Sequence, residues 1–352
     1  MHHSLISKFR GTLFGALIAG TLPLKDVKQI TDSALLTQEA IDGLVFSSKS
    51  LISQGKFDLG DWLLKKQANP SLDQTNLNQT NLNQANEQLL LTTFFATLPI
   101  ALFCHENPLK LKQNITDVVR LYSDDSGIRD TNLAVGYAIA KSLTGTINPT
   151  TLIPQIVNFL GDTSSNTPQQ LLKVDDLLRQ GANLEQVSSE LSQLELSQLE
   201  LSKTGLDKKN SSNQNVSSQV IAEAFYCFLA TMEDFRSSIL LSHRQSNPSL
   251  RAISPITGAL SGAYNSTVGI PLAWQIRYSQ QKSAKLHSNT YLQMVKLADE
   301  LLAVWSGVYN IDNQASETNK TGDFTFHSNR LPLLKPDSHL QVFTSTHVNK
   351  LR

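Results

Sequence analysis

A stretch of small residues in the last third of the chain constrains the fold more than any other feature. Residues 258–263 read Gly-Ala-Leu-Ser-Gly-Ala, so Gly258 and Gly262 are four positions apart. On a helix such positions share one face, and a face without bulk lets another backbone approach closely. The segment 249–264 is therefore predicted to be a buried helix. Apolar residues on a three-to-four spacing predict two further helices before it, beginning at 216 and 233.

A second set of small residues lies near the N-terminus. Gly11, Gly15 and Ala19 recur every four positions and form one face of a helix predicted over residues 5–19. This face predicts a place at the centre of a helical bundle. Two basic residues and a short apolar run are also what a signal peptide shows. The glycines favour close packing instead, and the run is shorter than the roughly 18 apolar residues of a membrane span.

Charge and cysteine usage restrict the partners and the compartment. The 30 Lys and Arg residues balance 30 Asp and Glu residues, which gives no indication of a nucleic-acid partner or of an anionic membrane. Cys104 and Cys227 lie in apolar runs without Cys-x-x-Cys or Cys–His spacing. Two buried thiols are therefore predicted rather than a disulfide, with a reducing cytoplasm as the expected location.

The helical signals predict one all-α domain over residues 1–309, followed by a polar, disordered tail over 310–352. Low-complexity insertions are predicted near 68–87, where Thr-Asn-Leu-Asn-Gln occurs twice, and near 188–216, where Leu-Ser-Gln-Leu-Glu occurs twice. Two pentads are too few to stack a solenoid, so the first insertion is interpreted as a loop. The second is predicted to be partly helical and partly disordered, because a period of five sustains no apolar stripe on a helix.

Prolines and polar segments predict several element boundaries. Pro99 is expected to kink or restart the apolar helix that begins near residue 88. Asn107 and Pro108 are expected to be the N-cap and first residue of the next helix. A polar linker is expected after Trp274, ahead of a final helix over 289–309.

The small-residue helix and the segment after it resemble the core of the ADP-ribosylglycohydrolase family. The family has a Gly-Ala-x-x-Gly-Ala helix that closes with Ile-Pro-x-x-Trp, which residues 258–263 and 270–274 match. The family's opening Arg-Gly-x-Leu-x-Gly pattern is matched by residues 10–15. The resemblance implies an orthogonal, all-α helical bundle. It also implies an ancestral activity that removes ADP-ribose from an acceptor by cleaving its glycosidic bond, with a pair of Mg²⁺ ions.

The metal-binding motifs of the family are altered in this chain. Counting back from Gly258, the two aspartates of the family's Gly-Gly-Asp-x-Asp-Thr motif fall on Ser249 and Arg251. Its Thr-Asp-Asp-Thr motif is reduced to Thr31 and Asp32. Mg²⁺ needs several hard oxygen ligands, and a cation at 251 would repel it. No cofactor is therefore expected, and Mg²⁺ only if the ancestral activity survives.

The same four residues are candidates for ligand binding. The resemblance implies that Thr31, Asp32, Ser249 and Arg251 face a former nucleotide site, where Arg251 would neutralise a phosphate. Two structural alternatives remain open. Thr31 and Asp32 have the residue types of a helix N-cap. A solvated Arg251 side chain beside a helix start is the alternative to phosphate binding.

An acidic turn supplies further candidate catalytic residues. Asp124 and Asp125 lie in the turn 123–127, and Asp130 follows them. Paired carboxylates can act as acid and base, and with Asp32 they are candidates for a rebuilt catalytic site. A turn followed by an N-cap uses the same residue types, and that structural interpretation is favoured.

Three functional hypotheses follow. The altered motifs favour a non-catalytic family member that acts as a binding or interaction module, with ADP-ribose or an ADP-ribosylated protein as the expected partner. The alternatives are an active hydrolase with a rebuilt site and a helical scaffold without a ligand. The catalytic alternative requires Asp32 to meet the turn 124–130 in space.

Overall fold

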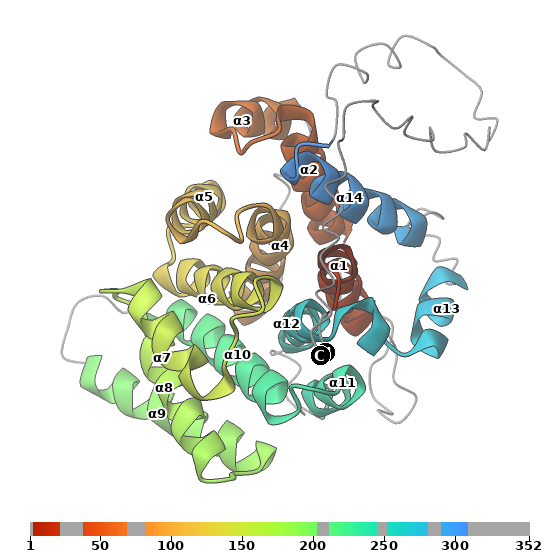
Figure 1. The fold of residues 1–352 in the computed structure, drawn as a ribbon. Helices are drawn as coiled ribbons and strands as arrows, with labels where there is room; N and C mark the ends of the chain where they lie inside the picture. The colour runs from red at the N-terminus through yellow and green to blue at the C-terminus, as the bar shows by residue number, and fades with distance from the viewer. Residues whose placement is uncertain are drawn as a thin grey trace, which may run out of the picture. The chain divides into compact units, whose positions relative to one another are not determined.

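The protein is described by a computed structural model in which residues 3–21, 38–68, 82–202, 211–244, 252–280 and 290–308 are defined (Figure 1). Throughout these residues the secondary structure is helical, with fourteen helices and no strand. All the described residues belong to one compact unit, Met1–Ile311, and the predicted disordered tail over 310–352 lies outside the described residues. The predicted all-α fold is confirmed.

The helices are α1 (Leu5–Thr21), α2 (Gln38–Gln54), α3 (Leu59–Ala68), α4 (Leu82–Phe103), α5 (Pro108–Arg120), α6 (Ser126–Leu143), α7 (Pro149–Leu160), α8 (Thr167–Arg179), α9 (Leu184–Ser202), α10 (Ser211–Ala230), α11 (Phe235–Ser242), α12 (Ile253–Gly269), α13 (Leu272–Gln280) and α14 (Thr290–Trp305).

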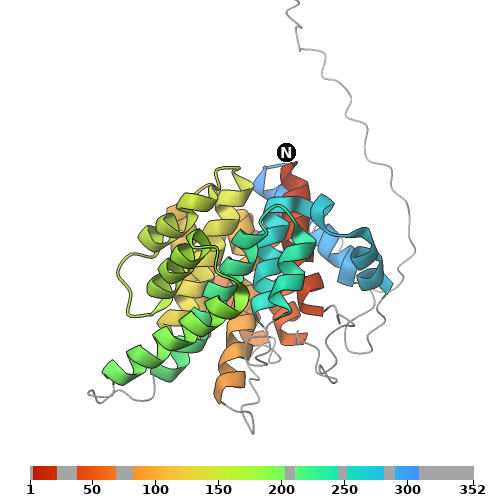
Figure 2. The same cartoon turned by 90° about the horizontal axis from the view of Figure 1, so that it is seen from below.

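Helices α1 and α12 form the tightest helix pair of the structure and lie side by side in both ribbon views (Figures 1 and 2). Gly11 faces Gly262, and Gly15 faces Gly258, so the two helices run antiparallel. A Cβ atom added to Gly262 would collide with the carbonyl oxygen of Gly11. The predicted close approach along these faces is confirmed, because only glycine leaves room for the opposite backbone.

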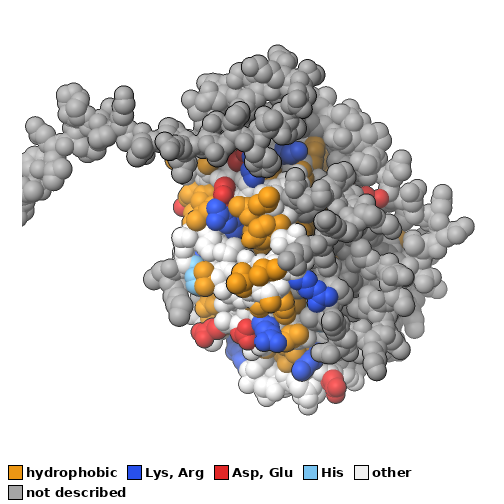
Figure 3. Space-filling view, turned by 90° about the vertical axis from the view of Figure 1, so that its right-hand side faces the viewer, with side chains coloured by type: hydrophobic (Ala, Val, Ile, Leu, Met, Phe, Trp, Pro, Cys, Tyr) orange, Lys and Arg blue, Asp and Glu red, His pale blue; other side chains and the backbone are white. Residues whose placement is uncertain are grey.

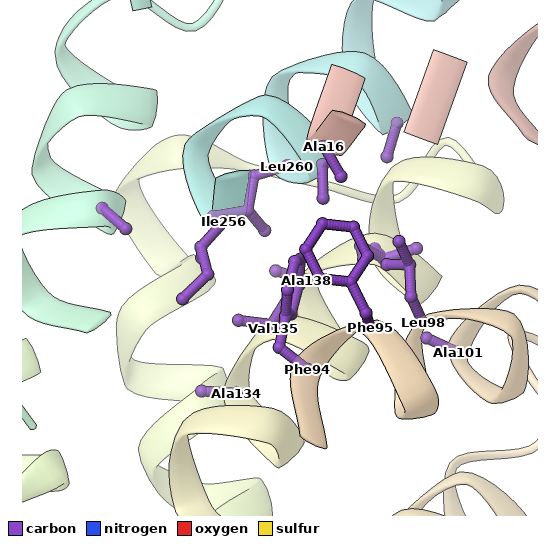
Figure 4. Packing of buried hydrophobic residues seen from close by; sticks show 14 of the residues in the cluster. Ala16, Phe94, Phe95, Leu98, Ala101, Ala134, Val135, Ala138, Ile256 and Leu260 are labelled. Atoms are coloured by element: carbon purple, nitrogen blue, oxygen red, sulfur yellow. The ribbon is translucent and has the colours of Figure 1, made fainter. Parts of the chain in front are cut away.

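The remaining helices surround this pair. Helices α6, α10, α11 and α14 contact it directly, while α2 and α5 pack on α4, and α7, α8 and α9 lie farther out (Figure 1). Aromatic and aliphatic side chains of α4, α6, α12 and α1 meet beside the pair (Figure 4). Those labelled there include Phe94, Phe95, Val135, Leu260 and Ala16. The central place predicted for the first helix is confirmed.

Helix α4 differs from its prediction at both ends. It runs without interruption from Leu82 to Phe103, so the predicted restart at Pro99 is wrong, while the alternative of a kink there stays a prediction. The residues on either side, Leu98 and Ile100, are buried, and this tertiary packing offsets the one helical hydrogen bond that a proline removes. The helix also includes residues 82–87, which were predicted to belong to a loop insertion. In the second predicted insertion, residues 188–202 and 211–216 are helical.

Residues 275–280, where a polar linker was predicted, belong to helix α13 instead, and residues 281–289 lie outside the described residues. Trp274 lies in the first turn of α13, and its ring packs edge-on against Phe235 with 6.3 Å between centroids. The Gln275 side chain donates hydrogen bonds to the carbonyl oxygens of Thr267 and Ile270, at 3.3 and 2.9 Å. These tertiary contacts order a segment that has no regular apolar pattern of its own.

The outer face of α13 carries exposed apolar side chains. Leu272 and Ile276 of α13 are respectively 69% and 45% exposed, and Val268, near the end of α12, is 76% exposed. Figure 3 views the side of the molecule on which α13 lies in Figure 1, and shows hydrophobic side chains spread among charged ones. In the described part of the chain, no helix is long and apolar enough to span a bilayer.

Both cysteines are buried free thiols, as predicted. Burial raises the pKa of Cys104 and of Cys227. The N-cap prediction at Asn107 is also confirmed, since its side chain accepts from the backbone N–H of Lys110 at 3.0 Å.

A carboxylic acid is buried between α9 and α10. Glu223 is fully buried, and its Oε1 accepts from the amide of Gln219 at 2.9 Å and the hydroxyl of Ser188 at 3.2 Å. Burial raises the pKa of Glu223 to about 7. The folded protein therefore keeps a proton that the unfolded chain releases, and this contribution to stability is lost as the pH rises from about 4.5 to about 7.

We expect Glu223→Gln to reduce the dependence of stability on pH. The amide keeps the shape of the protonated acid but does not titrate. As the pH rises from 5 to 8, the free energy of unfolding of the wild type should therefore fall by up to about 3 kcal/mol relative to that of the variant. Urea titrations at the two pH values measure this difference, and contributions of other groups cancel between the proteins. Glu185→Gln, at an exposed position of α9, is the control and should leave the dependence of stability on pH unchanged. An unchanged pH dependence in Glu223→Gln would contradict the assignment.

Candidate functional site

The altered family motifs fall in the two chain segments that follow α1 and precede α12. Because α1 and α12 are antiparallel, the last turn of α1 lies beside the first turn of α12. The segments 22–37 and 245–251 join this end in the chain, and they contain Thr31, Asp32, Ser249 and Arg251. These four candidates lie outside the described residues, so their roles stay predictions.

A buried carboxylate lies at the start of α12. Glu87 of α4 is 5% exposed, and its Oε1 accepts from the backbone N–H of Ala252 at 2.9 Å. Helix α12 has no side-chain cap of its own and no acidic residue in its first turn. A carboxylate is favoured at the N-terminus of a helix, where unbonded N–H groups and the helix dipole are positive.

A partly buried imidazole links α11 to the end of α1. Nε2 of His243 lies 3.2 Å from the carbonyl oxygen of Ala19, and because a carbonyl oxygen only accepts, Nε2 donates. Burial lowers the pKa of His243, and the hydrogen bond to Ala19 opposes this shift. Beside it, the hydroxyls of Ser242 and Ser254 are 2.9 Å apart and connect α11 to α12. Contacts within the protein therefore hold the last turn of α1 and the first turn of α12 in place.

Sequence reasoning missed Glu87 and His243. Glu87 fell within a predicted insertion, and His243 follows a short helix without any metal-ligand spacing. The one signal for Glu87 is a charged residue directly ahead of the long apolar run of α4. Nothing in the sequence indicates that it meets Ala252, which lies 165 positions away.

The acidic turn begins α6. Asp125 is the N-cap of this helix, and its Oδ1 accepts from the backbone N–H groups of Gly127 at 2.7 Å and Ile128 at 3.4 Å. Burial raises the pKa of Asp125, which the two backbone hydrogen bonds oppose. The favoured interpretation as a turn with an N-cap is confirmed, although the helix already starts at Ser126, within the turn predicted over residues 123–127. Asp124 is exposed beside it.

Asp130 binds the loop that precedes α8. It is 1% exposed and accepts from Nε of Arg129 at 2.9 Å and the hydroxyl of Ser165 at 2.6 Å. The hydroxyl of Thr163 donates to its second oxygen, and Thr163 in turn accepts from Arg129 at 3.0 Å. The structure thus places Asp125 and Asp130 in contacts that hold the start of α6. Whether Asp32 reaches them lies outside the described residues.

The described donors do not fit a binuclear Mg²⁺ centre. Over the defined part of the chain, no three His, Cys, Asp or Glu side chains converge so that they could hold a metal ion. Glu87 is bonded to the backbone of α12, and Asp130 is bonded to hydroxyls and a guanidinium. Mg²⁺ requires near-octahedral oxygen ligation that usually includes carboxylates, which these arrangements do not provide.

The fold and this end together define an all-α protein built on a glycine-mediated helix pair, with a candidate ligand-binding end formed by helix termini. The profile of a family described as ADP-ribosylglycohydrolase matches residues 1–310. The chain belongs to the ADP-ribosylglycohydrolase family. The predicted family resemblance is thereby confirmed.

A solved structure described as "ADP-ribosylglycohydrolase-related protein complex" has a similar fold. Its TM-score is 0.53 at 14% sequence identity, and the similarity covers 86% of this chain and 99% of that chain. At this identity the likeness concerns the fold and not the activity. No match is found among curated proteins.

Proposed function

We propose that this protein is a non-catalytic member of the family that acts as a binding or interaction module. The observation that carries the proposal is the start of α12. There the family's aspartate positions hold Ser249 and Arg251, and the next backbone N–H is bonded to a carboxylate of the protein itself. A glycosidase needs an acid and a base or a metal-activated water at the scissile bond. Asp125 and Asp130, two of the four candidate carboxylates, are bonded within the protein.

The partner that this site chemistry favours is ADP-ribose or an ADP-ribosylated protein. The family fold supports a nucleotide-shaped ligand, and the proposed recognition is independent of metal. Arg251 would supply the positive charge for the diphosphate, since a guanidinium binds phosphate oxygens through paired hydrogen bonds. This role is the family-based interpretation of a cation at a former ligand position.

Calorimetric titration with ADP-ribose tests the proposal. We expect the same affinity in excess Mg²⁺ and in chelator, and no release of ADP-ribose from a mono-ADP-ribosylated peptide in either buffer. Arg251→Ala should weaken the binding about tenfold or more, as expected for the loss of a charged hydrogen bond. Arg244→Ala, at an exposed position after α11, is the matched control.

Each result has a definite meaning. Binding that requires Mg²⁺, or release of ADP-ribose, would contradict the proposal and support an active hydrolase with a rebuilt site. Absence of binding in both buffers would reject ADP-ribose as the ligand and leave a helical scaffold. Unchanged affinity in Arg251→Ala would reject the role of Arg251 alone.

A further inference from the structure

The start of α12 is buried and lacks a local cap. Ala252 is fully buried with helical dihedral angles, and no side chain of the helix start bonds its backbone. The hydroxyl of Ser254 is bonded to Ser242 on α11 instead. A helix N-terminus leaves backbone N–H groups without partners, and inside a protein each such group costs free energy unless an acceptor is supplied.

Glu87 supplies this acceptor from a different helix. The carboxylate and the N–H of Ala252 are separated by 165 positions in the chain and by 2.9 Å in space. A buried carboxylate is itself unfavourable unless charge or hydrogen bonds compensate it. The helix dipole and the N–H group supply such compensation. The contact therefore gives the N–H group an acceptor and also stabilises the buried carboxylate.

The same end is where the family-based expectation and the described residues disagree. The resemblance implies Mg²⁺ here, yet the described donors do not fit such a centre. A contact that does not involve a metal ion joins α4 to the start of α12. Glu87 is the described residue that makes this connection with a charged group.

We propose that Glu87 is a positioning residue whose carboxylate fixes the start of α12 against α4 without a bound metal ion. The proposal rests on the proposed function, because it takes this end to be free of metal. It adds a specific residue and a specific contact to that function. The local order of the α12 start is then set by Glu87 and not by Mg²⁺.

Hydrogen exchange at the first turn of α12 tests this role in the full-length protein. In Glu87→Ala, we expect exchange of the Ala252 amide to accelerate at least tenfold, with a lower Tm. Glu87→Gln should retain most of the protection, because its carbonyl oxygen occupies the position of the accepting Oε1. Glu87→Asp should behave more like Glu87→Ala, because its side chain is one methylene shorter and does not reach. Glu106→Ala, at an exposed position just beyond α4, is the matched control.

Running each variant with Mg²⁺ and with chelator separates this proposal from the proposed function. Unchanged Ala252 exchange in Glu87→Ala would overturn the positioning role and leave the proposed function intact. Protection that appears in the wild type only with Mg²⁺ would overturn the metal-free function itself. If Glu87→Ala does not fold, the order of Glu87→Gln and Glu87→Asp decides, because a role based on charge alone would favour the aspartate.

Discussion

Gly262→Ala is expected to destabilise the protein by about 3 kcal/mol, the upper end of what overpacking usually costs. The added methyl group would collide with the carbonyl oxygen of Gly11 and come within 3.3 Å of the backbone nitrogen of Thr12. Both obstacles are backbone atoms of a buried helix, so no flexible side chain can move aside. The two helices would have to separate, which removes contacts along their whole length.

Gly43→Ala is the control for the intrinsic preference of alanine for helices. A Cβ atom at Gly43 would meet Ala96 at 3.7 Å and the carbonyl oxygen of Thr92 at 3.8 Å, which are ordinary contact distances. This substitution should therefore stabilise α2, by up to about 1 kcal/mol. Urea denaturation followed by circular dichroism measures both variants. Equal stability of Gly262→Ala and the wild type would mean that α1 and α12 do not approach as closely as described.

Asp130→Ala is expected to cost about 3 kcal/mol, as does the removal of one partner from other buried ion pairs. The substitution leaves the hydroxyls of Ser165 and Thr163 and the guanidinium of Arg129 without their shared acceptor. Asp130→Asn keeps the shape of the side chain but loses its charge. Its free energy of unfolding should lie between those of the wild type and Asp130→Ala. The same denaturation experiment measures these losses.

Asp124→Ala is the matched control, because this neighbouring carboxylate is exposed. Its change in stability should stay within about 0.5 kcal/mol. The pair also separates a structural role from a catalytic one. If Asp130→Asn abolished a measurable hydrolase activity while leaving the stability unchanged, Asp130 would be a catalytic residue and the structural assignment would be wrong.

The candidate site was only partly predictable, for reasons that particular residues make clear. The N-cap roles of Asn107 and Asp125 follow from short-range chemistry, since each side chain bonds a backbone N–H two or three positions away. Such contacts need no knowledge of the rest of the fold. Glu87 binds a distant backbone group, and its role depends on where α4 and α12 meet.

The helix restart predicted at Pro99 was wrong for a related reason. Local chemistry correctly identifies the missing N–H group, but whether the helix breaks depends on the packing around it. Here Leu98 and Ile100 are buried on either side of the proline and hold the helix together. Helix α13 is the opposite case, because it was not predicted. Its sequence pattern is weak, and contacts of Trp274 and Gln275 order the segment.

The amino-acid sequence was sufficient to predict an all-α fold and two helices with small-residue faces suited to close packing. Periodicity and capping act within a few residues, so they can be read along the chain. The pairing of these two faces on each other is visible only in the folded structure. The same is true of the contact of Glu87 with α12 and of Asp130 with the loop before α8. Those pairings are set by the burial of whole helices, and this depends on every element of the bundle at once.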